Sequence, residues 1–259
     1  MAYKDILVYL DATNDNESRL DLAISLAHAH GARLIGADAG TARALEGKWR
    51  ERATNLQTLF EEAIGRAELA GEFRTLDHAS DHHRYAHYVD LIIATEPEDA
   101  ARALVHADIP ERVLLASGGP MLLLPDGWRS RGRGVGTSIV IAWNASREAT
   151  RAVHDALPLL RRADKVTIFS FGPDDEQFRK QADLLAEHLL RHDVTAEAAI
   201  WTDTGELKPV EALFASLDTA DANMIVAGAY GRARWIEGLF GGTSRDLIHQ
   251  PSLPVLLSH

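Results

Sequence analysis

The chain has 259 residues, which exceeds a typical single domain and favours two. Its formal net charge of -11 at pH 7 argues against nucleic acid and anionic membrane surfaces as partners, because both are negatively charged. The absence of cysteine excludes disulfides, thiolate catalysis and cysteine-ligated zinc. No basic leader precedes the first apolar strand, and no apolar run approaches the ~20 residues that cross a bilayer, so we expect a cytoplasmic protein.

Apolar runs and helical patterns alternate through the first half of the chain. An apolar run at 4–10 ends at Asp11 and precedes a helical pattern that Gly31 closes as a C-terminal cap. The elements expected next are a strand at 32–37, a helix at 45–70, a strand at 73–76 and a buried strand at 90–94. Such alternation predicts a parallel sheet with helices packed on its faces.

The second half repeats this order. Its expected elements are a strand at 138–143, a helix from 147 to about 162, a strand at 165–171, a helix ending near 192, and strands at 194–201 and 223–227. Asn144 follows Asp11 by 133 positions, and Asn223 follows Asp90 by the same interval. We infer a duplicated domain, with copies at 1–126 and 137–259 joined by a linker rich in glycine and arginine. Each copy is expected to be a doubly wound, Rossmann-like α/β unit, with a five-stranded, mainly parallel sheet and helices on both faces.

Ligands bind such sheets outside the carboxyl ends of the strands, where the strand order reverses. A glycine-rich stretch follows the fourth strand of the second copy and leads to an expected helix at 245–250. Glycine lets a ligand approach the backbone closely, and a helix N-terminus offers unpaired amides and a positive dipole to a phosphate. Isolated glycine loops are weak signals, however, and a turn followed by a helix cap explains these residues about as well.

The order Gly228-x2-Gly231-x9-Gly241, ahead of a last helix and a Pro-Val-Leu strand, resembles the ATP-binding signature of universal stress proteins. The resemblance covers essentially the whole chain. It implies a nucleotide site in the second copy formed by Ala142, Asn144, Phe171, Ala227, Gly228, Gly231, Arg232, Gly241, Gly242, Thr243 and Ser244. Ala142 and Phe171 would line the adenine, and Asn144 would contact the base or the ribose. A core role for Phe171 and a turn or helix-cap role for Asn144 remain open alternatives.

Two residues depart from the family pattern. Family members place Ser or Thr directly after the third glycine, where this chain has Gly242, although hydroxyls follow at Thr243 and Ser244. They also usually place Asp at the end of the first strand, where the second copy has Asn144. An Asn amide still accepts from a ribose hydroxyl or donates to a base, but it carries no charge. The sequence leaves open whether these changes abolish ATP binding.

The first copy is not expected to bind a triphosphate. Thr95 and Glu98 replace the first two glycines of the signature, and Glu96 and Asp99 add negative charge. Two like charges ~4 Å apart cost about 1 kcal/mol in water and about 4 kcal/mol at an effective dielectric constant of 20. We therefore interpret Asp11 as a turn residue.

Histidines offer a second candidate chemistry. His78, His82, His83 and His87 gather before the fourth strand of the first copy, but nothing nearby supplies a complete ligand set, so a solvated helix face is favoured and metal binding stays open. His249, near the glycine loop, is better explained as a helix-end residue than as an acid or base. The sequence contains no nucleophile elbow and no Walker loop.

The sequence thus predicts a stress-response protein that binds one ATP, with Mg²⁺, in its second copy and hydrolyses it slowly at most. The alternative is an interaction module whose two copies bind no nucleotide. The resemblance also implies that the last strands, which begin at Pro120 and Pro254, pair the copies as an internal pseudo-dimer. Homodimerisation, protein partners and the triggering stress cannot be derived from the sequence.

Overall fold

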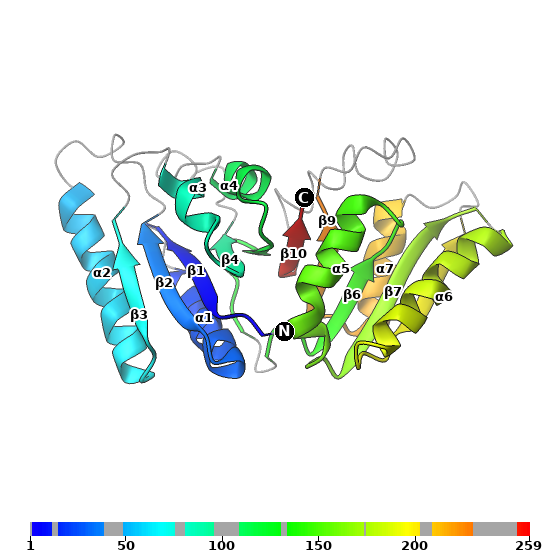
Figure 1. Ribbon diagram of the computed structural model, residues 1–259, viewed down its shortest axis with the longest axis horizontal. Coiled ribbons are helices and arrows are strands. Elements are labelled where there is room, and N and C mark those ends of the chain that lie inside the picture. The colour runs from blue at the N-terminus through cyan, green and yellow to red at the C-terminus, as the bar shows by residue number, and fades with distance from the viewer. Residues whose placement is uncertain are drawn as a thin grey trace. The chain divides into compact units, whose positions relative to one another are not determined.

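The computed structural model describes residues 2–11, 15–38, 49–75, 81–95, 109–130, 134–173, 175–202, 209–229 and 253–259. The chain divides into two compact units, unit 1 at Met1–Arg131 and unit 2 at Gly132–His259. Figure 1 labels their helices and strands. The sequence-derived limits, 1–126 and 137–259, leave out the linker and stay a prediction.

Unit 1 is a doubly wound α/β unit. Its elements are β1 (Asp5–Leu10), α1 (Asn16–His30), β2 (Arg33–Asp38), α2 (Trp49–Arg66), β3 (Gly71–Arg74), α3 (Asp81–Ala86), β4 (Leu91–Thr95), α4 (Ile109–Ser117) and β5 (Met121–Leu124). The strands lie in the order β3-β2-β1-β4-β5, and every pairing within the unit is parallel. Its central strands are buried except at Asp5, the first residue of β1, as a sheet covered on both faces requires.

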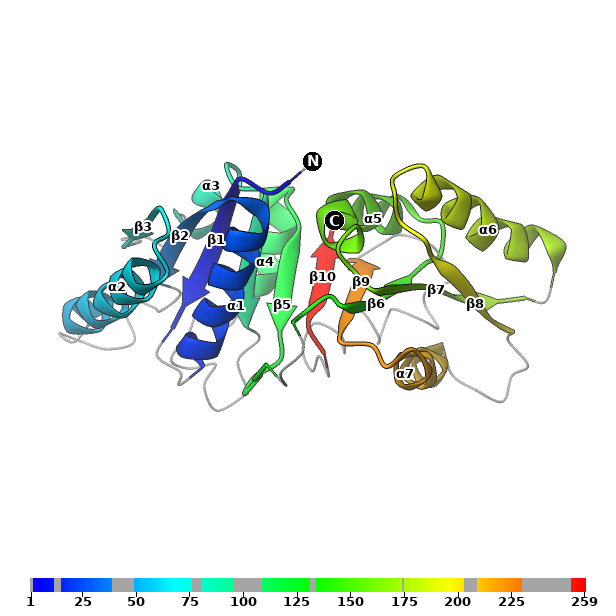
Figure 2. The ribbon, with the colours of Figure 1, turned by 90° about the horizontal axis from the view of Figure 1, so that it is seen from below.

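Unit 2 has the same architecture. Its elements are β6 (Ser138–Ala142), α5 (Arg147–Leu160), β7 (Lys165–Gly172), α6 (Glu176–Leu190), β8 (Glu197–Thr202), α7 (Pro209–Ala220), β9 (Met224–Gly228) and β10 (Val255–Ser258). The strands lie in the order β10-β9-β6-β7-β8 with parallel pairing. Figure 2 shows α5 and α6 together on one face of this sheet and α7 on the other. The expected α/β fold is confirmed.

The strand register recurs from one unit to the other. Ile6 of β1 pairs with Leu91 of β4 in unit 1. Ile139 of β6 pairs with Met224 of β9 in unit 2, and both residues stand 133 positions later. Residues separated by this interval therefore occupy equivalent places at the ends of the central strands.

Local sequence explains where the elements begin and end. Gly31 closes α1 with a left-handed φ of 61°, as expected from its position. Ser146 caps α5 by accepting a hydrogen bond from the Ala149 amide, and Asp175 caps α6 in the same way.

Two expected strands were placed wrongly. β3 begins at Gly71 instead of 73, because Gly71 already pairs with Leu34 of β2, at a place where a side chain would lie 2.6 Å from the Leu34 carbonyl oxygen. β8 begins at Glu197 instead of 194, because the Val194 amide still donates to the Leu189 carbonyl and closes the turn after α6. The apolar residue at 194 is buried under the helix end and is not part of the strand.

Candidate functional site

The strand order of unit 2 reverses between β6 and β9, which is where a doubly wound sheet binds ligands. Ala142 ends β6, and its partner in the register is Ala227 on β9, so these two predicted site residues lie side by side. Phe171 lies near the end of the neighbouring strand β7, two positions beyond the partner of Ala142. All three side chains are buried, so the core role considered for Phe171 also fits.

Asn144 lies in the tight turn between β6 and α5. Its Oδ1 accepts a hydrogen bond of 3.1 Å from the Ser146 amide, and Ala145 between them adopts a left-handed φ of 55°. This is the turn role that the sequence left open for Asn144. Within the described residues Nδ2 of Asn144 makes no hydrogen bond, so the amide still has a donor at this edge of the sheet.

Gly228 ends β9 against the first turn of α5. A Cβ built there would lie 2.5 Å from the Ala149 amide nitrogen and 2.5 Å from the Glu148 carbonyl carbon. The strand and the helix backbone therefore meet at a distance that only glycine permits. The packing of the unit alone requires glycine here, whatever the adjoining loop binds.

The remaining predicted site residues lie outside the described residues. They are Gly231, Arg232, Gly241, Gly242, Thr243 and Ser244, together with His249. Glu96, Glu98 and Asp99 of the first copy are also outside them. The loop that would hold phosphates thus stays a prediction.

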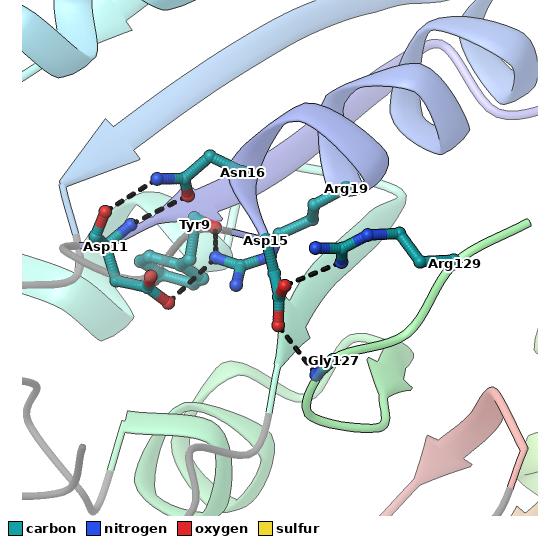
Figure 3. A network of polar contacts seen from close by, with 7 residues as sticks. All are labelled: Tyr9, Asp11, Asp15, Asn16, Arg19, Gly127 and Arg129. Carbon is teal, nitrogen blue, oxygen red and sulfur yellow. Dashed lines mark hydrogen bonds and ion pairs between the residues drawn. The ribbon is translucent and has the colours of Figure 1, made fainter.

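In unit 1 the equivalent position is filled by an arginine that the sequence reasoning missed. Arg19 of α1 is 1% exposed, and its Nη1 donates to Oδ2 of Asp11 at 2.9 Å and to the Tyr9 carbonyl oxygen at 2.6 Å. Asn16 holds the Asp11 backbone from the other side, donating to its carbonyl oxygen and accepting from its amide. Figure 3 shows these side chains converging at the end of β1.

The two units differ sharply in side-chain size at this place. Tyr9, Asn16 and Arg19 correspond, 133 positions later, to Ala142, Ala149 and Ala152. The Tyr9 phenol is buried, which raises its pKa well above the ordinary value, so the group stays neutral. Unit 1 therefore fills its switch point with its own polar side chains, whereas unit 2 carries only methyl groups at these positions.

Only His87 of the first-copy histidine cluster has a described side chain, so metal binding by the cluster stays open. Nδ1 of His87 donates a hydrogen bond of 3.2 Å to the Ser117 carbonyl oxygen, and the side chains of the other three lie outside the described residues. Among described residues no group of three or more His, Cys, Asp or Glu side chains is arranged to hold a metal ion. None of the described helices is both long and apolar enough to cross a membrane.

No protein-family model and no curated protein matches the chain. Several solved structures are similar to it. A universal stress protein from Archaeoglobus fulgidus DSM 4304 is similar over 98% of this chain and 95% of that chain, with a TM-score of 0.75 and 16% identity. A functionally unknown protein from Pseudomonas aeruginosa PAO1 is similar over 99% and 92%, with a TM-score of 0.60 and 16% identity. A universal stress protein from Archaeoglobus fulgidus in complex with dAMP matches 48% of this chain and 98% of its own, with a TM-score of 0.35 and 16% identity.

The two full-length similarities define the class of fold. The chain is a pair of doubly wound α/β units, each with a switch point at the ends of its two central strands. Over nearly its full length it has the fold of universal stress proteins.

Proposed function

We propose that the chain is a tandem universal stress protein and that unit 2 binds one adenine nucleotide, ATP, at the carboxyl ends of β6 and β9. The observation that carries the proposal is the contrast at the switch points. Unit 1 fills the space with Tyr9 and Arg19, whereas unit 2 has Ala142 and Ala152 at the positions 133 residues later. A bulky aromatic base is accommodated where side chains are small and apolar.

The residues of unit 2 suit the parts of a nucleotide. Ala142 and Phe171 supply an apolar surface for the adenine, and Asn144 offers its Nδ2 to the base or the ribose. Backbone groups of Ala227 and Gly228 border the same space. The phosphates would be held by amides, hydroxyls and the guanidinium of the following loop, from Gly231, Arg232, Gly241, Gly242, Thr243 and Ser244.

Magnesium would enter with the phosphates and not through a dedicated protein cage, since Mg²⁺ commonly binds through substrate phosphates and water. The bound nucleotide would act as a regulatory ligand in a stress response, with hydrolysis slow at most. The cytoplasm, expected from the sequence, fits such a role and is part of the proposal.

Calorimetry with ATP, ADP and AMP, with and without Mg²⁺, tests the nucleotide proposal. Gly231→Glu would bring a carboxylate to the predicted phosphate loop, and Ala142→Tyr would bring the unit 1 side chain into unit 2. We expect micromolar ATP binding to the unaltered chain and at least tenfold weaker binding to either variant. Gly65→Glu is the control, because it adds the same charge on α2 where a new side chain meets nothing within 4 Å.

The alternative is an interaction module that binds no nucleotide. Asn144 favours it, because its Oδ1 already serves the turn. Absent or millimolar ATP binding by the unaltered chain would support this alternative and end the nucleotide proposal. Pairing of the two copies through β5 and β10 as an internal pseudo-dimer belongs to either function and is proposed from the family resemblance alone.

A further inference from the structure

Three histidines of unit 2 lie together, His154 on α5, His188 on α6 and His192 just after α6, and the nucleotide proposal uses none of them. Nε2 of His154 on α5 is 3.2 Å from Nε2 of His188 on α6, and the two ring centroids are 5.3 Å apart. The ring of His192, four residues beyond His188, packs edge-on against the His188 ring, with 4.7 Å between the two ring centroids.

The short distance between the two Nε2 atoms has two physical explanations. One neutral ring can donate to the other, if the two adopt complementary tautomers. Alternatively, both nitrogens can face one metal ion. Two imidazole nitrogens bound at about 2.0–2.1 Å to a tetrahedral Zn²⁺ lie about 3.3 Å from each other. The observed 3.2 Å fits that separation.

The pair is accessible to an ion from outside. His154 is exposed to solvent, and His188 is half-buried beside it.

The histidine pair borders a pocket lined by apolar side chains. Both histidines line a pocket of about 340 Å³ between the helices, with Trp143, Leu184 and Leu185 among its apolar lining. Nε1 of Trp143 is buried and has no hydrogen-bond partner among the described residues. Apolar side chains beside an ion lower the local dielectric constant.

We propose that His154 and His188 chelate a divalent transition-metal ion through their Nε2 atoms and thereby link α5 to α6. Imidazole ligands suit Zn²⁺, Ni²⁺ and Cu²⁺, and Zn²⁺ is the reference ion. No third His, Cys, Asp or Glu side chain of the described residues converges on the pair. The ion therefore keeps open positions, which water fills or which a small ligand in the pocket occupies.

Zn²⁺ titration by calorimetry, with the apoprotein prepared in chelator, tests the site. His154→Ala and His188→Ala should each remove one site or weaken it at least about tenfold, since losing an outer-shell partner alone commonly costs that much. His28→Ala is the matched control, because His28 is an exposed histidine on a helix of unit 1. Binding to histidines elsewhere is common to all these proteins and cancels in the comparison.

A second readout separates ligation from loss of structure. In spectra of ¹⁵N-labelled histidine, one equivalent of Zn²⁺ should shift the Nε2 resonances of His154 and His188 together. Unchanged resonances, or alanine variants that bind Zn²⁺ as the control does, would overturn the proposal and leave a neutral hydrogen bond between the rings.

Discussion

Arg19 and Asp11 form an ion pair at 2.9 Å with side-chain exposures of only 1% and 5%. The pair joins α1 to the end of β1, and the same guanidinium also reaches the Tyr9 carbonyl oxygen. Figure 3 shows the contrast with Asp15 and Arg129, an ion pair at 2.6 Å whose arginine is half exposed. Two ion pairs of one unit thus differ mainly in their access to water.

Arg19→Ala should destabilise unit 1 by about 3–5 kcal/mol, because it removes the positive charge next to a buried carboxylate. Arg129→Ala should cost at most about 1 kcal/mol, because its guanidinium is half exposed and the Gly127 amide still donates to Asp15. Urea unfolding of the whole chain, followed by a probe in each unit, measures both. Equal effects of the two variants would contradict the distinction between them.

Gly228→Ala should destabilise unit 2 by about 1–3 kcal/mol, since the new methyl group meets the α5 backbone at 2.5 Å. Gly65→Ala should have the opposite sign and stabilise α2 by about 0.5–1 kcal/mol, because its site is open and helical. Thermal and urea unfolding compare the two. A neutral Gly228→Ala would mean that β9 and α5 can separate at little cost.

Asn144→Ala should destabilise unit 2 by about 0.5–1.5 kcal/mol, because the Ser146 amide loses its acceptor in the turn. Asn144→Asp keeps that acceptor and should cost less. Unfolding midpoints at pH 7 rank the variants. If both variants lose the same stability, the Oδ1 contact contributes nothing.

Zn²⁺ should raise the unfolding temperature of the unaltered chain, because an ion that links α5 to α6 binds the folded state in preference to the unfolded one. At a free Zn²⁺ concentration 100 times its Kd the stabilisation is about 2.7 kcal/mol. Chelator should reverse the shift, and His188→Ala should abolish it. A shift that survives in His188→Ala would point to histidines elsewhere.

Much of the fold follows from the sequence, because strand runs and helix caps are local signals. Residues 138–142 form the expected strand, and Gly31 ends α1 where its backbone freedom predicts. α7 was missed, although it begins at Pro209, a residue suited to the first turn of a helix. Neither β3 nor β8 begins where periodicity alone places it, since close backbone contacts set both boundaries.

The site was harder to predict than the fold. Ala142 and Ala227, which the family resemblance implies as site residues, lie side by side because position at a switch point depends only on strand order, and their role stays a prediction. Arg19 was missed because its role depends on burial, which the sequence does not display. A signal was nevertheless present: Arg19 falls among the apolar positions of its helix and aligns with an alanine in the second copy. The turn contact of Asn144 and the packing of Gly228 likewise depend on distances between segments.

Arg19 and Tyr9 fill the switch point of unit 1, so only unit 2 would respond to a nucleotide. If unit 2 binds ATP as proposed, one chain offers one class of sites, and its saturation curve is hyperbolic. Two copies of a fold would then yield no homotropic cooperativity within a chain, so any sharper response to nucleotide levels must arise from association between chains.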